Sequence, residues 1–405
     1  MYSLAIYLYM FCVAVASLFN KKAKLMLRGQ HNTYRILREK RDPNAQYIWF
    51  HAASLGEFEQ GRPLMERLRA QHPEYKILLT FFSPSGYEVR KDYEGADIVC
   101  YLPFDTSLNA RKFLRLARPS KAFFIKYEFW QNYLHKLHRR HIPTYSVSSI
   151  FRENQIFFRP YGRVYAGVLK CFDRLFVQNE HSRELLNTLG VNQVSVVGDT
   201  RFDRVIDIKQ AAKDVPMAAA FAKDHYVLVA GSTWQPDEDI LISYFNRHPE
   251  QRLILAPHVV SEEHLAEIER KLERPSLRLS RATLASASQA ECLIIDGYGL
   301  LSSIYRYGQV AYVGGGFGVG IHNVPEAAVY GVPVFIGPNN RKFREAQKLL
   351  ACGGCIEIHN AEEFAQVADR FFTNDTARNE AGQAAGSYIA CNAGAAQAIF
   401  EAVTW

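Results

Sequence analysis

The sequence predicts an α/β protein of two domains, each built around a doubly wound sheet of parallel strands. Short apolar runs alternate with helical patterns along almost the whole chain. Runs that stay apolar at every position are typical of parallel strands buried on both faces, and their alternation with helices gives right-handed βαβ units. A chain of 405 residues is too long for one ordinary core and fits two domains.

Two series of predicted strands divide the chain. The first comprises residues 47–51, 76–81, 97–102, 121–126, 143–148, 174–178 and 194–197, and the second comprises residues 226–230, 252–256, 292–296, 309–313, 332–336 and 355–358. We therefore predict an N-terminal domain over residues 21–205, a linker over 206–224 and a C-terminal domain over 225–405. Ligands of such folds bind at the carboxyl ends of the strands, in the crevice between domains.

The N-terminus is expected to contact a membrane. Residues 1–19 carry no charge, and about 20 apolar residues span a bilayer. The basic residues that follow are Lys21, Lys22, Lys24 and Arg28. Positive charge after the apolar run, rather than before it, predicts a signal-anchor over residues 1–20 with the remaining chain in the cytoplasm. Two alternatives stay open: a cleaved signal peptide, because residues 14–16 resemble a cleavage site, and a helix lying in the interface.

Composition narrows the class of protein. A hydrophobic content of 48% with 22% charged residues is ordinary for a globular protein and excludes a disordered chain. The net charge of +7 favours an anionic partner or surface, but it is modest and accompanies no RNA-binding motif, so no nucleic-acid partner is predicted. Residues 21–41 hold eight Lys or Arg and only one acid, Glu39, which favours an anionic membrane surface. Seven scattered cysteines indicate reduced thiols.

A glycine-rich segment in the second half resembles a ligand-binding loop. A strand ends at Val313, glycines follow at 314, 315, 316, 318 and 320, and residues 322–326 (His-Asn-Val-Pro-Glu) open a helix. Glycines let a ligand approach the backbone, and a helix start attracts phosphate. The spacing fits neither GxGxxG nor a Walker motif. We predict nucleotide binding, the alternative being a glycine-rich turn with a capping Asn.

Other polar residues follow strands of the same series. Ser232 and Thr233 follow strand 226–230, and Pro257 and His258 follow strand 252–256. Each is weak evidence alone, but together they form a ring at one sheet edge. No cluster has metal-ligand spacing, so no metal site is predicted.

Two glutamates of the first half could carry chemistry. Glu57 lies in Ser54-Leu55-Gly56-Glu57, which also fits a capping box. Glu128 lies just past the strand at 121–126, where site residues gather, although it could equally be a surface or cap glutamate. Residue types alone leave both alternatives open.

Seven motifs, in this order and spacing, resemble the 3-deoxy-D-manno-octulosonic acid (Kdo) transferase family along nearly the whole chain. They are HAASLGE (51–57), SPSGYE (83–88), YLPFD (101–105), KYEFWQN (126–132), GDTRFD (198–203), GST (231–233) and the segment GGGFGVGIHNVPEAAVYGVPVFIGP (314–338).

The resemblance implies a GT-B glycosyltransferase with two doubly wound domains, a cleft between them and an N-terminal apolar anchor helix. It implies inverting transfer of Kdo from CMP-Kdo to a hydroxyl of a lipid A precursor, without a cofactor, at the cytoplasmic face of the inner membrane. Glu57 would be the general base, and Glu128 would be a second catalytic residue. The nucleotide would be held by His322, Asn323 and Glu326 together with Gly314, Gly315, Gly316, Ser232, Thr233, Pro257 and His258.

The chain departs from the family pattern at three places. One acid of the ExE pair is Lys126, the His of STHxGEE is Trp234, and the PRH that follows a strand is Pro257-His258-Val259. These departures indicate a divergent branch of the family or a related sugar donor. Two alternative functions also stay open. One is a different sugar-nucleotide enzyme, such as a UDP-sugar transferase or an epimerase. The other is a membrane-tethered binding protein of two α/β lobes without catalytic activity.

Overall fold

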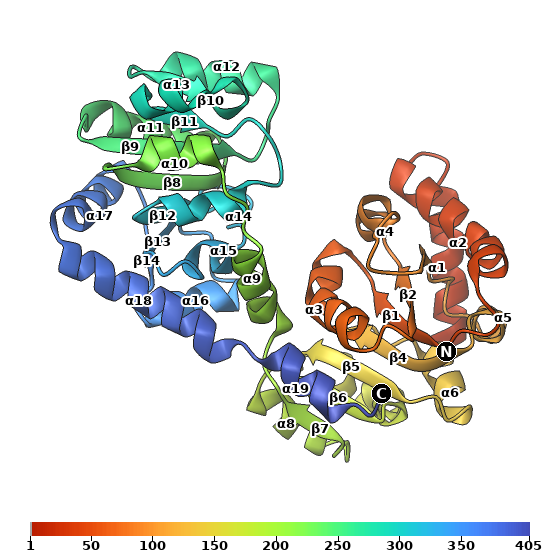
Figure 1. The fold of residues 1–405 in the computed structure, drawn as a ribbon. Coiled ribbons are helices and arrows are strands. Elements are labelled where there is room, and N and C mark those ends of the chain that lie inside the picture. The colour runs from red at the N-terminus through yellow and green to blue at the C-terminus, as the bar shows by residue number, and fades with distance from the viewer. Residues whose placement is uncertain (1) are drawn as a thin grey trace. The chain divides into compact units, whose positions relative to one another are not determined.

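A computed structural model describes residues 2–405, and only Met1 of the predicted anchor lies outside it. The chain divides into two compact units (Figure 1). The N-terminal unit holds residues 2–204 and 393–405, and the C-terminal unit holds residues 205–392. The sequence analysis places residues 393–405 with the C-terminal domain, whereas the structure returns them to the N-terminal unit.

Each unit is built on a seven-stranded sheet in which all pairings are parallel. The N-terminal sheet has the order β3-β2-β1-β4-β5-β6-β7, formed by β1 (Tyr47–Ala52), β2 (Lys76–Phe81), β3 (Ile98–Tyr101), β4 (Pro119–Ile125), β5 (Thr144–Ser149), β6 (Arg174–Val177) and β7 (Val194–Val196). The C-terminal sheet has the order β10-β11-β9-β8-β12-β13-β14, formed by β8 (Tyr226–Thr233), β9 (Gln251–Pro257), β10 (Ser276–Arg278), β11 (Cys292–Ile294), β12 (Val310–Val313), β13 (Val334–Ile336) and β14 (Cys355–Glu357). Every predicted strand forms, and β10 is an additional short edge strand.

Helices connect the strands, as the predicted alternation requires. Those of the N-terminal unit are α1 (Tyr2–Ala16), α2 (Lys21–Lys40), α3 (Leu55–Gln71), α4 (Pro84–Arg90), α5 (Ser107–Ala117), α6 (Gln131–Arg139), α7 (Arg163–Ala166), α8 (Glu180–Asn187) and α19 (Ala395–Ala402). Those of the C-terminal unit are α10 (Pro216–Ala222), α11 (Gln235–Arg247), α12 (Glu262–Lys271), α13 (Leu284–Gln289), α14 (Leu301–Ile304), α15 (Val324–Ala328), α16 (Arg344–Ala351), α17 (Ala361–Thr373) and α18 (Asp375–Asn392). Helix α9 (Thr200–Gln210) crosses the boundary between the units.

The strands are apolar throughout because both faces of each sheet are covered. In β1, Ile48 and Phe50 join a core cluster that includes residues of α3 and α19. Tyr47 and Trp49 join a different cluster, which includes residues of α5 and α6. Successive side chains of a strand point to opposite faces, so a strand between two cores cannot alternate between apolar and polar residues.

Both sheets reverse their strand order at one point. The reversal lies between β1 and β4 in the N-terminal sheet and between β8 and β12 in the C-terminal sheet. The connections on the two sides of such a point leave in opposite directions, which opens a crevice at the carboxyl ends of the two strands. The fold therefore marks two places for ligands, one in each unit.

The predicted membrane anchor is not supported. Within residues 2–405, no helix combines the length and the apolar character that crossing a bilayer requires. Helix α1 has 15 residues and is about 22 Å long at 1.5 Å per residue, because the chain turns after Ala16 and Asn20 caps α2. The apolar core of a bilayer is about 30 Å thick.

Helix α1 packs on the N-terminal unit along one stripe. Val13 is buried against Met26 of α2 and Phe104, with Ile6 and Met10 beside them. The hydroxyl group of Tyr2 donates a hydrogen bond to Asp105 Oδ2 at 2.6 Å. The opposite stripe stays exposed, at Leu4, Leu8, Phe11 and Val15.

Residues 393–405 belong to the N-terminal unit because their aromatic side chains complete its core. Phe400 is buried and stacks on Trp405, with ring centroids 4.6 Å apart. Trp405 in turn stacks on Phe123 of β4. The carboxylate of Asp203 accepts hydrogen bonds from the backbone N–H groups of Gly394 and Ala396, which ties the start of α19 to the same unit.

Truncating Phe400 tests this docking. Phe400→Ala should reduce the free energy of unfolding by about 3–5 kcal/mol, because it removes a buried ring and leaves a cavity. Chemical denaturation of the full chain measures the effect. Leu284→Ala, at a side chain 58% exposed on α13, is the control and should change stability by less than about 0.5 kcal/mol. Equal effects of the two substitutions would show that the last helix does not contribute to the core.

Candidate functional site

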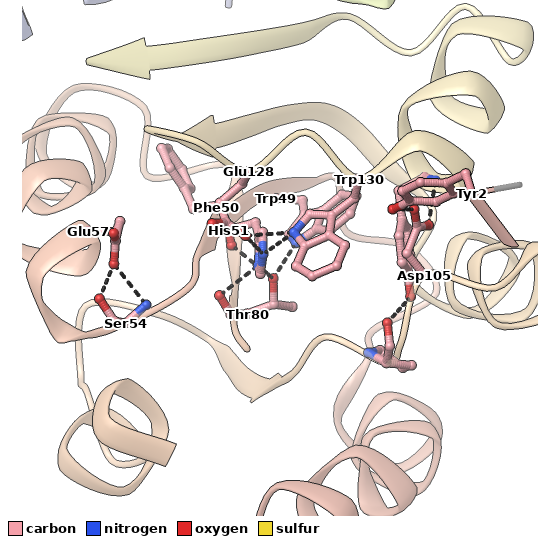
Figure 2. Close-up of polar contacts among 12 residues, drawn as sticks. Tyr2, Trp49, Phe50, His51, Ser54, Glu57, Thr80, Asp105, Glu128 and Trp130 are labelled. Atoms are coloured by element: carbon pink, nitrogen blue, oxygen red, sulfur yellow. Dashed lines mark hydrogen bonds and ion pairs between the residues drawn. The ribbon is translucent and has the colours of Figure 1, made fainter. Parts of the chain in front are cut away.

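Glu57 caps the helix that carries it. Its Oε2 atom accepts the backbone N–H of Ser54 at 3.0 Å and the hydroxyl group of the same serine. Ser54 is the N-cap of α3, so the capping box predicted from the sequence forms. Both bonds use Oε2, which leaves Oε1 outside the capping interaction. Figure 2 shows Glu57 pointing toward Ser54 and lying apart from the cluster around His51.

Glu128 belongs to a different polar cluster, at the reversal point between β1 and β4. Its Oε2 atom lies 3.1 Å from His51 Nε2, and the indole N–H of Trp130 donates to the same oxygen at 2.6 Å. His51 is fully buried at the end of β1, and the Glu128 side chain is 12% exposed. His51 and Trp130 therefore hold Glu128 at the edge where site residues are expected.

Buried hydrogen-bonding groups hold the ring of His51 in place (Figure 2). Trp49 Nε1–H donates to Thr80 Oγ1 at 2.8 Å, and Thr80 Oγ1 lies 2.9 Å from His51 Nδ1. The backbone carbonyl oxygen of Thr80 lies 3.1 Å from the same Nδ1, and the indole N–H of Trp130 lies within hydrogen-bond distance of Nε2, at 3.0 Å. Sequence reasoning assigns no role to His51 or Thr80. The sequence signal for His51 was its position as a polar residue at the end of a continuous apolar run.

In the C-terminal unit, a buried carboxylate organises the glycine-rich loop. Asp237 is 1% exposed, and its oxygens accept from Tyr312 Oη at 2.7 Å, Trp234 N at 2.9 Å and Gly315 N at 2.8 Å. One side chain on α11 thereby fixes the end of β8, strand β12 and the start of the loop. No role for Asp237 is predicted from the sequence, because its local pattern does not distinguish it from an ordinary helix-capping residue.

Close backbone packing explains two of the loop's glycines. A Cβ atom on Gly314 would lie 2.4 Å from the carbonyl oxygen of Ser232, and one on Gly316 would lie 2.5 Å from Gly337. Ser232 itself has a φ angle of 53°, a left-handed conformation that costs a non-glycine residue of order 1–3 kcal/mol and is often found at functional sites. The backbones of β8 and β12 are therefore forced together at the reversal point.

A cavity of about 280 Å³ lies beside this contact. Four of the predicted binding residues line it: Ser232, Pro257, His258 and Glu326. Two more contact these four, because Asn323 Nδ2 donates to Glu326 Oε1 at 2.7 Å and the ring of His322 stacks on His258. The volume of the cavity approaches that of small-molecule binding sites.

The remaining predicted binding residues do not line the cavity. Thr233 is buried and donates its hydroxyl proton to Glu238 Oε1 at 3.0 Å. Burial raises the pKa of Glu238, although Thr233 and His264 donate to it. Gly314, Gly315 and Gly316 shape the loop without lining the cavity. Helix α15 has only five residues, so its dipole is short.

Burial and the neighbouring His258 lower the pKa of His322. Its Nε2 accepts the indole N–H of Trp234 at 3.1 Å, which a protonated ring could not do. The geometry and the pKa direction agree that His322 is neutral.

Comparisons with known proteins complete the description of the site. Residues 28–204 match the family model described as 3-deoxy-D-manno-octulosonic-acid transferase, and this segment lies within the N-terminal unit and covers most of it. A Kdo transferase of Aquifex aeolicus is 26% identical over 78% of this chain and 83% of its own. One of Haemophilus influenzae is 24% identical over 89% of this chain and 87% of its own.

Solved structures share the fold. The UDP-GlcNAc 2-epimerase of Neisseria meningitidis superimposes with a TM-score of 0.61 at 12% identity, covering 88% of this chain and 99% of the epimerase. A glycosyltransferase of kitacinnamycin superimposes with a TM-score of 0.53 at 12% identity, over 88% and 98%. Such likeness establishes the fold and does not separate a transferase from an epimerase.

The two parallel-sheet units and the family match define a glycosyltransferase with the GT-B fold. Within that class the chain is a relative of the Kdo transferases, as its ordered motifs predict. The prediction that the chain is an enzyme is therefore confirmed, which argues against a binding protein without catalytic activity.

Removing the Asp237 carboxylate tests its organising role. Asp237→Ala should reduce the free energy of unfolding by more than about 3 kcal/mol, because it leaves three donors without their acceptor at about 1–3 kcal/mol each when buried. Asp239→Ala is the control, since its side chain is 55% exposed and pairs with Lys271 at the surface, where an ion pair contributes about 0–1 kcal/mol. Denaturation curves that coincide for the two variants would contradict the role.

Proposed function

We propose that this enzyme transfers Kdo from CMP-Kdo to a hydroxyl group of a lipid A precursor, in lipopolysaccharide biosynthesis. The observation that carries the proposal is the sequence match to proteins named Kdo transferases over most of the chain. A UDP-sugar transferase or an epimerase remains the alternative, and the match argues against both. The cavity between Ser232 and Glu326 is the proposed donor site in the C-terminal unit.

The proposed reaction is a single displacement with inversion. The acceptor hydroxyl oxygen attacks the anomeric carbon of Kdo while the bond from that carbon to the phosphate oxygen breaks. Glu57 takes the hydroxyl proton, and CMP leaves with the bonding electron pair. The free Oε1 of Glu57 can serve as the base while Oε2 keeps the capping bonds to Ser54. A positioned general base contributes typically about 10²–10⁴-fold.

The proposed role of Glu128 is to bind a hydroxyl group of the acceptor. The indole N–H of Trp130 donates to its Oε2, and the ring of His51 contacts the same atom, so its orientation is set before the acceptor arrives. Preorganised hydrogen-bonding groups avoid reorganisation during the reaction.

Glu57→Gln separates catalysis from capping. Glutamine fills the same capping position as glutamate but cannot accept the proton, so the variant should keep the stability of the wild type and lose about 10²–10⁴-fold in kcat. Transfer is measured as CMP release with CMP-Kdo and a lipid A precursor, and stability is measured by denaturation.

Ser54→Ala is the matched control for this experiment. It removes the cap and keeps the carboxylate, so it should lose about 0.5–2 kcal/mol of stability with little change in kcat of the folded enzyme. Wild-type kcat in Glu57→Gln would rule out Glu57 as the base.

The proposed site of action is the cytoplasmic face of the inner membrane. The exposed stripe of α1 is apolar, and three exposed lysines, at 21, 22 and 24, begin α2. Apolar side chains beside basic residues favour the interface of an anionic bilayer. This arrangement corresponds to the interfacial alternative left open by the sequence analysis.

A double substitution on the stripe tests membrane contact. Replacing both Leu8 and Phe11 by Ser should lower co-sedimentation with phosphatidylglycerol vesicles at least about tenfold, because it removes apolar area from the contact. Leu108→Ser, at a side chain 69% exposed on α5, is the control for a general loss of surface hydrophobicity. If the double variant sediments like the wild type, α1 does not mediate binding.

A further inference from the structure

Two of the departures from the family pattern meet in space. The ring of His258 stacks on Trp234 with centroids 4.6 Å apart and planes 25° apart, and on His322 with centroids 4.6 Å apart and planes 28° apart. Trp234 and His322 are joined edge to edge by the hydrogen bond described above. The imidazole ring of His258 therefore packs on both Trp234 and His322, which are hydrogen-bonded to each other.

The backbone also fixes the place of His258. Its N–H donates to the carbonyl oxygen of Thr233 at 2.9 Å, so the residue is bound to the end of β8. It is exposed and lines the same cavity as Glu326. Among the residues that line this cavity, His258 is the only one whose side chain can carry a positive charge.

His258 is the lining residue that could offer a phosphate a charged donor, whereas the hydroxyl groups of Ser232 and Ser302 are neutral donors. The Glu326 carboxylate contributes negative charge, and an anion beside it requires a compensating donor or cation. His322 cannot supply a proton from Nε2, because that atom accepts from Trp234. Tyr298, also at the cavity, accepts the N–H of Val260, and its hydroxyl group offers one neutral donor at most.

We propose that His258 is the phosphate-contacting residue of the donor site and takes up a proton when the phosphate of the nucleotide binds. The inference rests on the proposed function for the identity of that nucleotide. His258 stands where the family pattern has an arginine, so this enzyme would hold the donor by a contact that depends on a proton rather than by a permanent charge.

The groups around His258 support proton uptake on binding. Glu326 lines the same cavity and carries the negative charge nearest to the proposed phosphate position. The neighbouring His322 accepts a hydrogen bond at Nε2 and is neutral. A bound phosphate would place negative charge beside the ring and favour its protonated form, so affinity for the phosphate should fall as the pH rises.

Calorimetry with CMP and cytidine tests the proposal, because the two ligands differ only in the phosphate. Titrations near pH 7 in two buffers of different ionisation enthalpy report the protons taken up. The wild type should prefer CMP and take up a fraction of a proton with CMP but none with cytidine. His258→Gln should lose about 10-fold or more of the preference, as expected for a charge-assisted hydrogen bond, and His258→Arg should keep the preference without proton uptake.

His225→Gln is the matched control, since His225 is an exposed histidine of the same unit outside the cavity. It should behave like the wild type. Undiminished preference and proton uptake in His258→Gln would overturn the role of His258 while leaving the donor site intact. A wild type that binds neither CMP nor cytidine would overturn the donor assignment itself, together with this inference.

Discussion

The reversal of strand order in each sheet is the constraint on which both sites depend. All strands are parallel and most are covered on both faces, so polar side chains have few places other than the strand ends. At β1/β4 and β8/β12 the connections diverge and leave room for a ligand. His51 and Glu128 lie at the first of these points, and Ser232 and Gly314 lie at the second.

Each candidate site is organised by a buried polar group. His51 fixes Glu128 in the N-terminal unit, and Asp237 fixes Trp234 and the glycine-rich loop in the C-terminal unit. Buried groups of this kind are stabilising only when every donor has an acceptor. That requirement links the stability of each unit to the geometry of its site, although the residues concerned are far apart in sequence.

Much of the fold was predictable because it depends on local pattern. Continuous apolar runs identified the strands, and Ser54 with Glu57 identified a helix start that forms as expected. The short edge strand β10 was missed because Ser276–Arg278 has too few apolar residues to make a run. The predicted anchor helix is not supported, because hydropathy does not register where a helix ends and α1 ends at Ala16.

The candidate site was predictable only in outline. Residues next to strand ends were found, since parallel strands bring their carboxyl ends to one edge. The stacking of Trp234 and His258 was not found, because it joins the ends of different strands, β8 and β9, and depends on side-chain conformation. The return of residues 393–405 to the N-terminal unit depends on Phe400 and Trp405 meeting Phe123, a long-range contact without a local signal.

The most direct test of the proposed function is incubation of the enzyme with CMP-Kdo and a lipid A precursor, followed by mass spectrometry of the lipid. The account predicts a lipid that gains the mass of Kdo, with release of one CMP for each sugar transferred. Parallel incubation with UDP-sugars should leave both the lipid and the nucleotide unchanged. An unmodified lipid with CMP-Kdo, together with consumption of a UDP-sugar, would contradict the account.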